Sequence, residues 1–98
     1  MKLPRIKNYP KSVRVKDEDY AVKMFKCKLD KEKTITLGDC NSTDKVIRIY
    51  TKQSATMILR TLIHELTHAM DDEYQIKLTH KQVYILEEAL YDLLRENF

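Results

Sequence analysis

The stretch SATMILRTLIHELTHAMDDE, residues 54–73, contains no Gly and no Pro, and its apolar residues recur at helical spacing. A step of about 100° per residue gathers these apolar residues on the side of the helix that lies away from His64. They are Ile58, Leu59, Leu62, Ile63, Leu66, Ala69 and Met70. The other side carries His64, His68, Thr61, Met57 and Asp71, with Glu65 on its flank. We therefore expect an amphipathic helix from about Ser54 to Glu73.

The chain before this helix predicts a small sheet. Segments with strand-like alternation or many β-branched residues are Ser12–Val15, Tyr20–Leu29, Thr34–Leu37 and Val46–Tyr50. Charged or Asn- and Asp-containing turns lie at 17–19, 30–33 and 41–44. The alternation of apolar and polar residues shifts by one position within Tyr20–Leu29, which indicates a bulge or the end of a strand. We expect three to four short strands in an antiparallel meander, followed by helices.

A second helix is predicted from Thr79 to about Asn97. Thr79 and Gln82 have the spacing of a capping box, in which each side chain bonds a backbone N–H of the first turn. The apolar stripe of this helix is Val83, Leu86, Leu90, Leu93 and Leu94. Gly38, the only glycine, is expected in a backbone conformation that other residues resist. The fold class is therefore α+β.

Length and composition favour one small domain over residues 1–98, with residues 1–11 as a loose lead-in. No apolar run approaches the roughly 18 residues that cross a bilayer, and the N-terminus lacks the apolar stretch of a signal peptide. We therefore expect a cytoplasmic protein with no membrane partner. Cys27 and Cys40 fit a reducing compartment as free thiols, and a disulfide or a second metal site using both is the alternative.

Charge is distributed unevenly along the chain. Residues 1–52 carry 14 Lys and Arg against 7 Asp and Glu, whereas residues 53–98 carry 4 against 8, giving +3 overall. A lysine-rich half could contact nucleic acid. The half lacks clustered arginines, interleaved aromatic residues and any nucleic-acid motif, so a solvated surface is the better interpretation and nucleic acid is not an expected partner.

The helix 54–73 carries the strongest chemical signal. His64 and His68 are four residues apart, so both imidazoles can reach one metal ion from the same side of the helix. Glu65 lies beside that ion rather than on it, in a position to accept a proton from a metal-activated water. A pair of solvated histidines on a helix surface is the alternative interpretation.

A catalytic zinc site takes a third protein ligand. Glu87 lies at the border of the apolar stripe of the second helix and Glu88 nearly opposite it, so Glu87 is preferred by helical position. Glu88 and His80 remain alternatives.

Other polar residues near the pattern have candidate supporting roles. Asp71 and Asp72 could orient a ligand histidine or simply end the helix. Possible donors to a developing oxyanion are Tyr74, Tyr84 and Tyr91.

The HELTH pattern at 64–68, with two glutamates in a following helix, resembles the zincin metallopeptidases and looks like their gluzincin branch, whose third ligand is a downstream glutamate. Thermolysin-like spacing implies Glu88 instead of Glu87. The metzincin pattern differs, because position 74 is Tyr where that branch has a histidine. With LGDC at 37–40, residues 34–98 are more closely similar to small HExxH proteins of phages, prophages and mobile elements of Gram-positive bacteria, related to the ImmA/IrrE-type group.

These observations predict a zinc-dependent metallopeptidase. His64, His68 and Glu87 would hold Zn²⁺, Glu65 would act as general base, and a peptide or protein substrate would pair with the strand Val46–Tyr50. The alternative is a catalytically silent zinc-binding protein of a phage or mobile element that binds a host or regulatory protein. The resemblance to the ImmA/IrrE-type group implies regulators as the proteins that are cleaved or bound.

Overall fold

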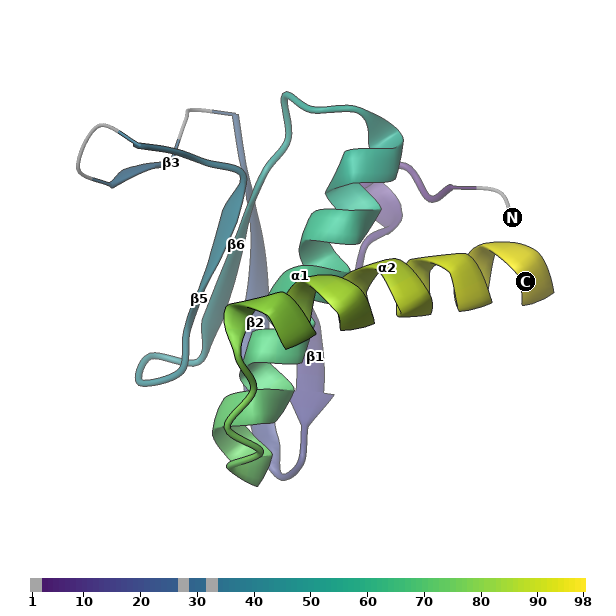
Figure 1. Ribbon diagram of the computed structural model, residues 1–98. Coiled ribbons are helices and arrows are strands. Elements are labelled where there is room, and N and C mark those ends of the chain that lie inside the picture. Colours follow the sequence, from purple (N-terminus) through teal and green to yellow (C-terminus); the bar gives the residue numbers. More distant parts are fainter. Residues whose placement is uncertain (1–2, 27–28, 32–33) are drawn as a thin grey trace.

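A computed structural model describes residues 3–26, 29–31 and 34–98 of the chain, and it has the α+β arrangement that the sequence predicts: a four-stranded sheet followed by two helices (Figure 1). The sheet contains β1 (Ser12–Val15), β2 (Glu18–Phe25), β5 (Gly38–Asn41) and β6 (Val46–Tyr50). The helices are α1 (Ala55–Tyr74) and α2 (His80–Asn97). A short 3-10 turn, η1 (Ile6–Asn8), precedes β1, and a separate two-stranded hairpin consists of β3 (Leu29–Lys31) and β4 (Thr34–Thr36).

The sheet is mixed, in the order β1-β2-β6-β5. Both β1–β2 and β5–β6 are antiparallel, although β5 was not among the expected strands. The expected antiparallel meander is wrong for the central pair, because β2 and β6 are parallel, with Val22 opposite Ile47 and Met24 opposite Ile49. The parallel pair arises because the chain leaves the sheet after β2, forms the β3–β4 hairpin and returns through β5. As a result β6 lies in the interior of the sheet and β5 at its edge.

The turns and strand ends follow local chemistry. The phase change predicted within Tyr20–Leu29 coincides with the end of β2 at Phe25, and Cys27 lies outside the described residues, so the alternatives for the two cysteines stay predictions. The predicted turn after β5 is present, because the Asn41 side-chain oxygen accepts hydrogen bonds from the backbone N–H groups of Thr43 and Asp44, each at 3.0 Å. This turn directs β6 back along β5.

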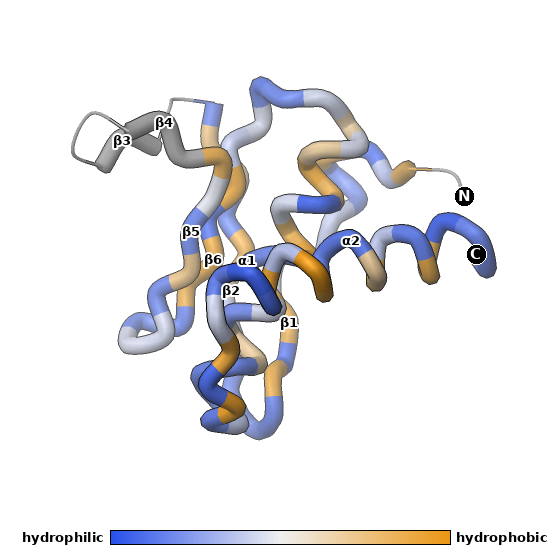
Figure 2. Tube along the Cα trace, viewed as in Figure 1, coloured by the Kyte–Doolittle hydropathy of each residue, from blue (hydrophilic) through white to orange (hydrophobic). Residues whose placement is uncertain are grey.

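Helix α1 covers one face of the sheet, and α2 packs on α1 (Figure 1). Ser54 caps α1 by accepting a hydrogen bond from the backbone N–H of Met57 at 3.2 Å, so the predicted start is confirmed. The core between α1 and the sheet consists chiefly of Tyr9, Val15, Tyr20, Val22, Ile47, Ile49, Ile58, Leu62 and Ala69. Figure 2 shows apolar segments both in the strands of the sheet and in α1.

The buried side of α1 includes the predicted residues Ile58, Leu62, Ile63 and Ala69 but is wider than predicted. Thr61 and Glu65, both expected on the solvated side or its flank, are buried at 6% exposure each, whereas Met70 is exposed. Hydrophobic periodicity placed the buried side opposite His64, but α1 has two packed sides, one on the sheet and one under α2. Glu65 therefore belongs to the side that faces the sheet.

The absence of a side chain at Gly38 leaves room for Thr61 and Glu65 of α1 against the sheet. Gly38 lies in extended β5 and has no positive φ, so the expected unusual backbone conformation is wrong. A Cβ atom at this position would lie 2.6 Å from Cγ2 of Thr61, 2.9 Å from the Arg48 carbonyl oxygen and 3.4 Å from Oε2 of Glu65. The glycine is needed because α1 approaches the strand closely at this point.

Helix α2 begins with the predicted capping box, in which Thr79 Oγ1 accepts from the Gln82 N–H at 3.1 Å and the Gln82 side chain accepts from the Thr79 N–H at 2.8 Å. Its predicted apolar stripe is buried only in part: of α2, Val83 and Glu87 are buried, whereas Leu86 and Leu93 are exposed. Neither α1 nor α2 is long and apolar enough to cross a membrane.

A polar cluster joins the C-terminal end of α1 to the sheet. Oε2 of Glu73 accepts hydrogen bonds from the Tyr20 hydroxyl and from Lys45 Nζ, both at 2.5 Å. These two donors, Lys45 first, hold the pKa of Glu73 below its ordinary value of 4.5. The ionised carboxylate therefore stabilises the fold above about pH 4.5, and this contribution is lost as the pH falls through the lowered pKa.

We expect Glu73→Gln to be less stable than the wild type at pH 7 and to lose less stability on acidification. The physical reason is that glutamine keeps the shape of the side chain and removes the titrating charge. Melting temperatures measured between pH 3 and pH 7 test this, with Glu88→Gln, an exposed acid of α2, as the matched control. Parallel stability curves for Glu73→Gln and the wild type would contradict it.

Candidate metal centre

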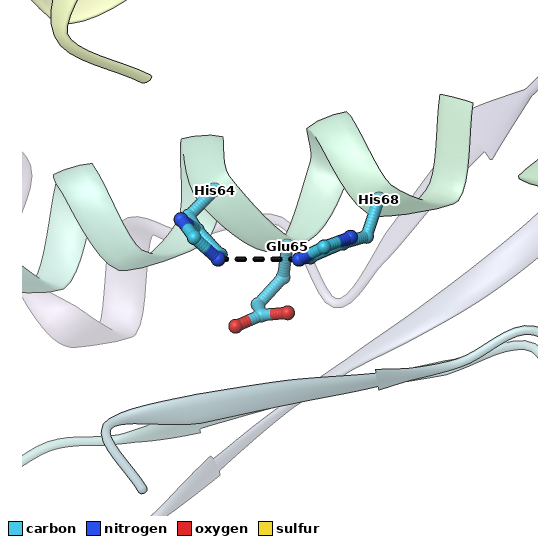
Figure 3. Close-up of side chains that lie close together, drawn as sticks. All are labelled: His64, Glu65 and His68. Carbon is cyan, nitrogen blue, oxygen red and sulfur yellow. Dashed lines mark hydrogen bonds between the residues drawn. The ribbon is translucent and has the colours of Figure 1, made fainter. Parts of the chain in front are cut away.

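Three potential metal ligands of α1 converge on one point. A nitrogen of His64, a nitrogen of His68 and a carboxylate oxygen of Glu65 all lie within 4.8 Å of one another, so the group could hold a metal ion. The two rings stand on the same side of the helix because four residues separate them. Glu65 extends from the same stretch of α1 toward the sheet, with its carboxylate beside the two rings (Figure 3).

The two imidazole rings face each other through their Nε2 atoms. Nε2 of His64 lies 3.2 Å from Nε2 of His68, and the ring planes meet at 69° (Figure 3). Two nitrogens bound tetrahedrally to one zinc ion, each at about 2.0–2.1 Å, lie roughly 3.3 Å apart. The spacing of the donor atoms therefore fits a zinc ion, and it also permits an N–H···N hydrogen bond between the neutral rings.

His68 has the protonation state that a metal-binding histidine needs. Burial, followed by the nearby rings of His64 and His80, lowers the pKa of His68 below its ordinary value, although Asp72 and Asp71 oppose the shift. His68 is therefore neutral at pH 7, which is the form that binds metal ions.

Glu87 lies next to His64. It is buried and faces α1, as its helical position suggested, while Glu88 is exposed. Its Oε1, however, lies 3.0 Å from Nδ1 of His64, the ring nitrogen that does not face His68. Its other oxygen accepts a hydrogen bond from Nε of Arg60 at 2.9 Å. In this arrangement Glu87 is a hydrogen-bond partner of a candidate ligand and lies outside the converging group, and its role as third ligand stays a prediction.

The contact with Glu87 selects the form of His64 that can bind a metal. A carboxylate paired with Arg60 can only accept hydrogen bonds. Nδ1 of His64 therefore carries the ring's hydrogen atom, and this N–H group donates a hydrogen bond to Glu87. Nε2 then presents its lone pair toward His68 and Glu65. Partners of this kind fix the tautomer and orientation of metal-binding histidines.

We expect Glu87→Ala to weaken zinc binding by about 10–100-fold, because His64 loses the partner that orients it. Glu87→Gln should weaken it less, since the amide oxygen can still accept the hydrogen bond from Nδ1. Competition with a chromogenic chelator measures both affinities, and Glu88→Ala is the control. Equal losses for the alanine and glutamine variants would instead identify Glu87 as a direct ligand.

The remaining polar candidates lie further from the point of convergence. His80 is exposed at the first position of α2, its ring centroid 6.0 Å from that of His68, and it is not part of the converging group. Asp71 accepts a hydrogen bond from the Leu78 N–H at 3.0 Å, so it anchors the connection between the helices. Asp72 is exposed.

A cleft of about 530 Å³ opens beside the converging group, between α1, α2 and the start of β5. Its lining residues are Leu37, Gly38, Met57, Arg60, Thr61, His64, Glu65, Tyr84 and Glu87. Of the three tyrosines considered, Tyr84 is the one on this cleft, with its ring centroid 4.9 Å from that of His64. Tyr74 instead lies under the Lys16 ammonium, and Tyr91 lies against Arg60 and Arg95.

Sequence reasoning missed Arg60 and Gly38 as site residues. Arg60 precedes His64 by four residues, the same spacing that links His64 to His68, and this spacing could have identified it. Gly38 carried a signal too, as the only glycine in the chain, but the signal was interpreted as a backbone requirement instead of a close approach of helix to strand.

Comparisons with protein-family models, with curated proteins and with solved structures found no match to this chain. The resemblance to zincin metallopeptidases accordingly stays a prediction.

Proposed function

We propose that the protein is a zinc-dependent peptidase that acts at the cleft beside His64, Glu65 and His68. The observation that carries the proposal is the convergence of two imidazole nitrogens and a buried carboxylate within 4.8 Å of one another, with His64 and Glu65 lining this cleft. Zinc is preferred over other divalent ions because imidazole ligands in a tetrahedral arrangement suit it. The proposal includes a cytoplasmic location.

The chain's own residues have separate roles. His64 and His68 hold the ion, and Glu87 keeps His64 in the tautomer that binds it. A zinc ion in this position makes water a stronger acid and polarises a carbonyl group. Glu65 accepts the proton of the attacking water and delivers it to the leaving amine. Tyr84, at the rim of the cleft, is placed to donate a hydrogen bond to the carbonyl oxygen as it gains charge.

The edge strand β5 is the proposed docking element for an extended peptide. The sequence suggested Val46–Tyr50 for this role, but β6 is paired on both sides, with β2 and β5. Among the strands of the described residues, β5 has a neighbour on one side only, and its first residue, Gly38, lies beside Glu65. A peptide that pairs with β5 would pass close to the converging group.

The proposal is tested on one preparation of the purified chain. We expect about one equivalent of zinc by mass spectrometry of the native protein, and cleavage of a mixed peptide library that stops on chelation and returns with added zinc. His64→Ala should lose both the zinc and the cleavage. Protein that takes up no zinc even from excess salt, or cleavage that persists after the metal is removed, contradicts the proposal.

A zinc-binding protein without catalytic activity is the second candidate. It is favoured by the position of Glu87, which bonds to His64 and Arg60 and so leaves the two histidines and Glu65 as the converging donors in the described part of the chain. In that case Glu65 would complete the set of ligands rather than act as a base, and the protein would bind a host or regulatory protein. Stoichiometric zinc without cleavage of any library peptide would support this candidate.

A further inference from the structure

Arg60 stands on the wall of the cleft, one helical turn before His64. Residues 60, 64 and 68 follow each other at four-residue spacing, so their side chains line one side of α1 with neighbouring Cβ atoms about 5–6 Å apart. The cleft next to Arg60 is partly apolar, through Leu37, Met57 and the ring of Tyr84. A positive charge in such surroundings is screened by water less than one on an open surface.

The side chain of Arg60 is held in place from two directions. Its Nε donates to Glu87 at 2.9 Å, and its guanidinium carbon lies 5.5 Å from the centre of the Tyr91 ring. Glu87 is the one acid paired with Arg60 among the residues that the structure describes. The Nε–H group is only one of five N–H donors of a guanidinium. The amino groups at its end therefore have no acidic partner in that part of the chain, and 32% of the side chain is exposed.

We infer that Arg60 determines specificity by binding a carboxylate of the peptide that occupies the cleft. A guanidinium fixed in one orientation binds a carboxylate through two parallel hydrogen bonds, with little loss of side-chain freedom. Glu87 does not cancel this preference, because its charge is shared between Arg60 and the N–H group of His64. The carboxylate belongs to an Asp or Glu side chain next to the cleaved bond or to the C-terminus of the peptide.

This inference deepens the proposed peptidase function, but its test needs neither zinc nor turnover. Fluorescently labelled peptides that differ in a single Glu or Gln are titrated into the metal-free chain, and binding is followed by anisotropy. A second pair, a free C-terminal acid and its amide, distinguishes the two sources of the carboxylate. We expect the acidic member of one pair to bind about tenfold more tightly than its neutral partner.

Substitutions of Arg60 test whether the tighter binding of the acidic peptide depends on this residue. Arg60→Gln should abolish the tenfold difference, and Arg60→Lys should retain part of it, because lysine keeps the charge without the planar fork. Arg95→Gln is the matched control: Arg95 also lies against the Tyr91 ring, 5.7 Å from its centre, but is not part of the cleft lining. It should leave the preference unchanged.

Three results would overturn the inference: equal affinities within both peptide pairs, a preference that survives in Arg60→Gln, or no binding of acidic peptides at concentrations up to about 1 mM. Failure of the peptidase proposal is seen separately, as missing zinc or missing cleavage in the wild type. A binding preference that depends on Arg60 would stand in either case.

Discussion

Glu65→Gln should lower kcat for peptide cleavage by about 10²–10⁴-fold, while the zinc content and KM stay close to those of the wild type. The glutamine side chain has the same shape as Glu65, which is buried at 6% exposure against the sheet, so the packing of α1 is preserved. It cannot accept a proton, and the attacking water loses its base. Steady-state kinetics with one library-derived peptide, with the zinc content measured on the same sample, test this expectation.

The same variant separates the two proposed functions. If Glu65 is a metal ligand, Glu65→Gln should lose zinc affinity together with activity, as His64→Ala does. Glu65→Asp provides the matched comparison, because it keeps the carboxylate but withdraws it by one methylene, and we expect intermediate activity with zinc retained. Cleavage by Glu65→Gln at the rate of the wild type would remove Glu65 from the mechanism.

Gly38→Ala should destabilise the protein by about 1–3 kcal/mol and reduce cleavage along with it. The added methyl group would lie 2.6 Å from Cγ2 of Thr61 and 2.9 Å from the carbonyl oxygen of Arg48, and the second contact is with backbone that cannot rotate away. Replacing a glycine outside the left-handed region normally stabilises by about 0.4–1 kcal/mol through the unfolded chain, which is less than the cost of this overlap. Urea unfolding measures the net effect.

A double variant tests whether the close approach of α1 to β5 is the cause of the stability lost in Gly38→Ala. Thr61→Ser removes Cγ2 and keeps the hydroxyl that donates to Gln53 at 3.3 Å, so Gly38→Ala combined with Thr61→Ser should recover part of the lost stability. Recovery should be incomplete, since the Arg48 carbonyl remains. Additive losses from the two substitutions would show that strand β5 and helix α1 do not clash at this point. An unchanged unfolding free energy for Gly38→Ala alone would contradict the close approach itself.

The substitutions at Glu65 and Gly38 should lower kcat for different reasons. In the proposed mechanism Glu65 acts on the attacking water, whereas Gly38 sets the distance between β5 and α1, on which the position of Glu65 depends. A displacement of about 1 Å in a catalytic group can cost on the order of 100-fold in rate. Gly38→Ala should therefore lower kcat more than its loss of stability alone would suggest.

Local sequence determined most elements of this protein, the edge strand β5 excepted, and half of its candidate site. Capping residues fixed the starts of both helices at Ser54 and Thr79, and the Asn41 turn was evident from composition, because these signals depend only on hydrogen bonds within a few residues. The four-residue spacing of His64 and His68 placed their rings together for the same reason. Helical geometry also turned Glu87 toward α1.

Tertiary structure decided which partner each of these side chains meets. The parallel pairing of β2 with β6 places β5 at the sheet edge, and the absence of a side chain at Gly38 lets Glu65 lie buried against that edge. The crossing of α2 over α1 brings Glu87 to Nδ1 of His64 and to Arg60, and so makes it a hydrogen-bond partner of a candidate ligand. Hydrophobic periodicity could not foresee this, because it describes one helix at a time and α1 is packed on two sides.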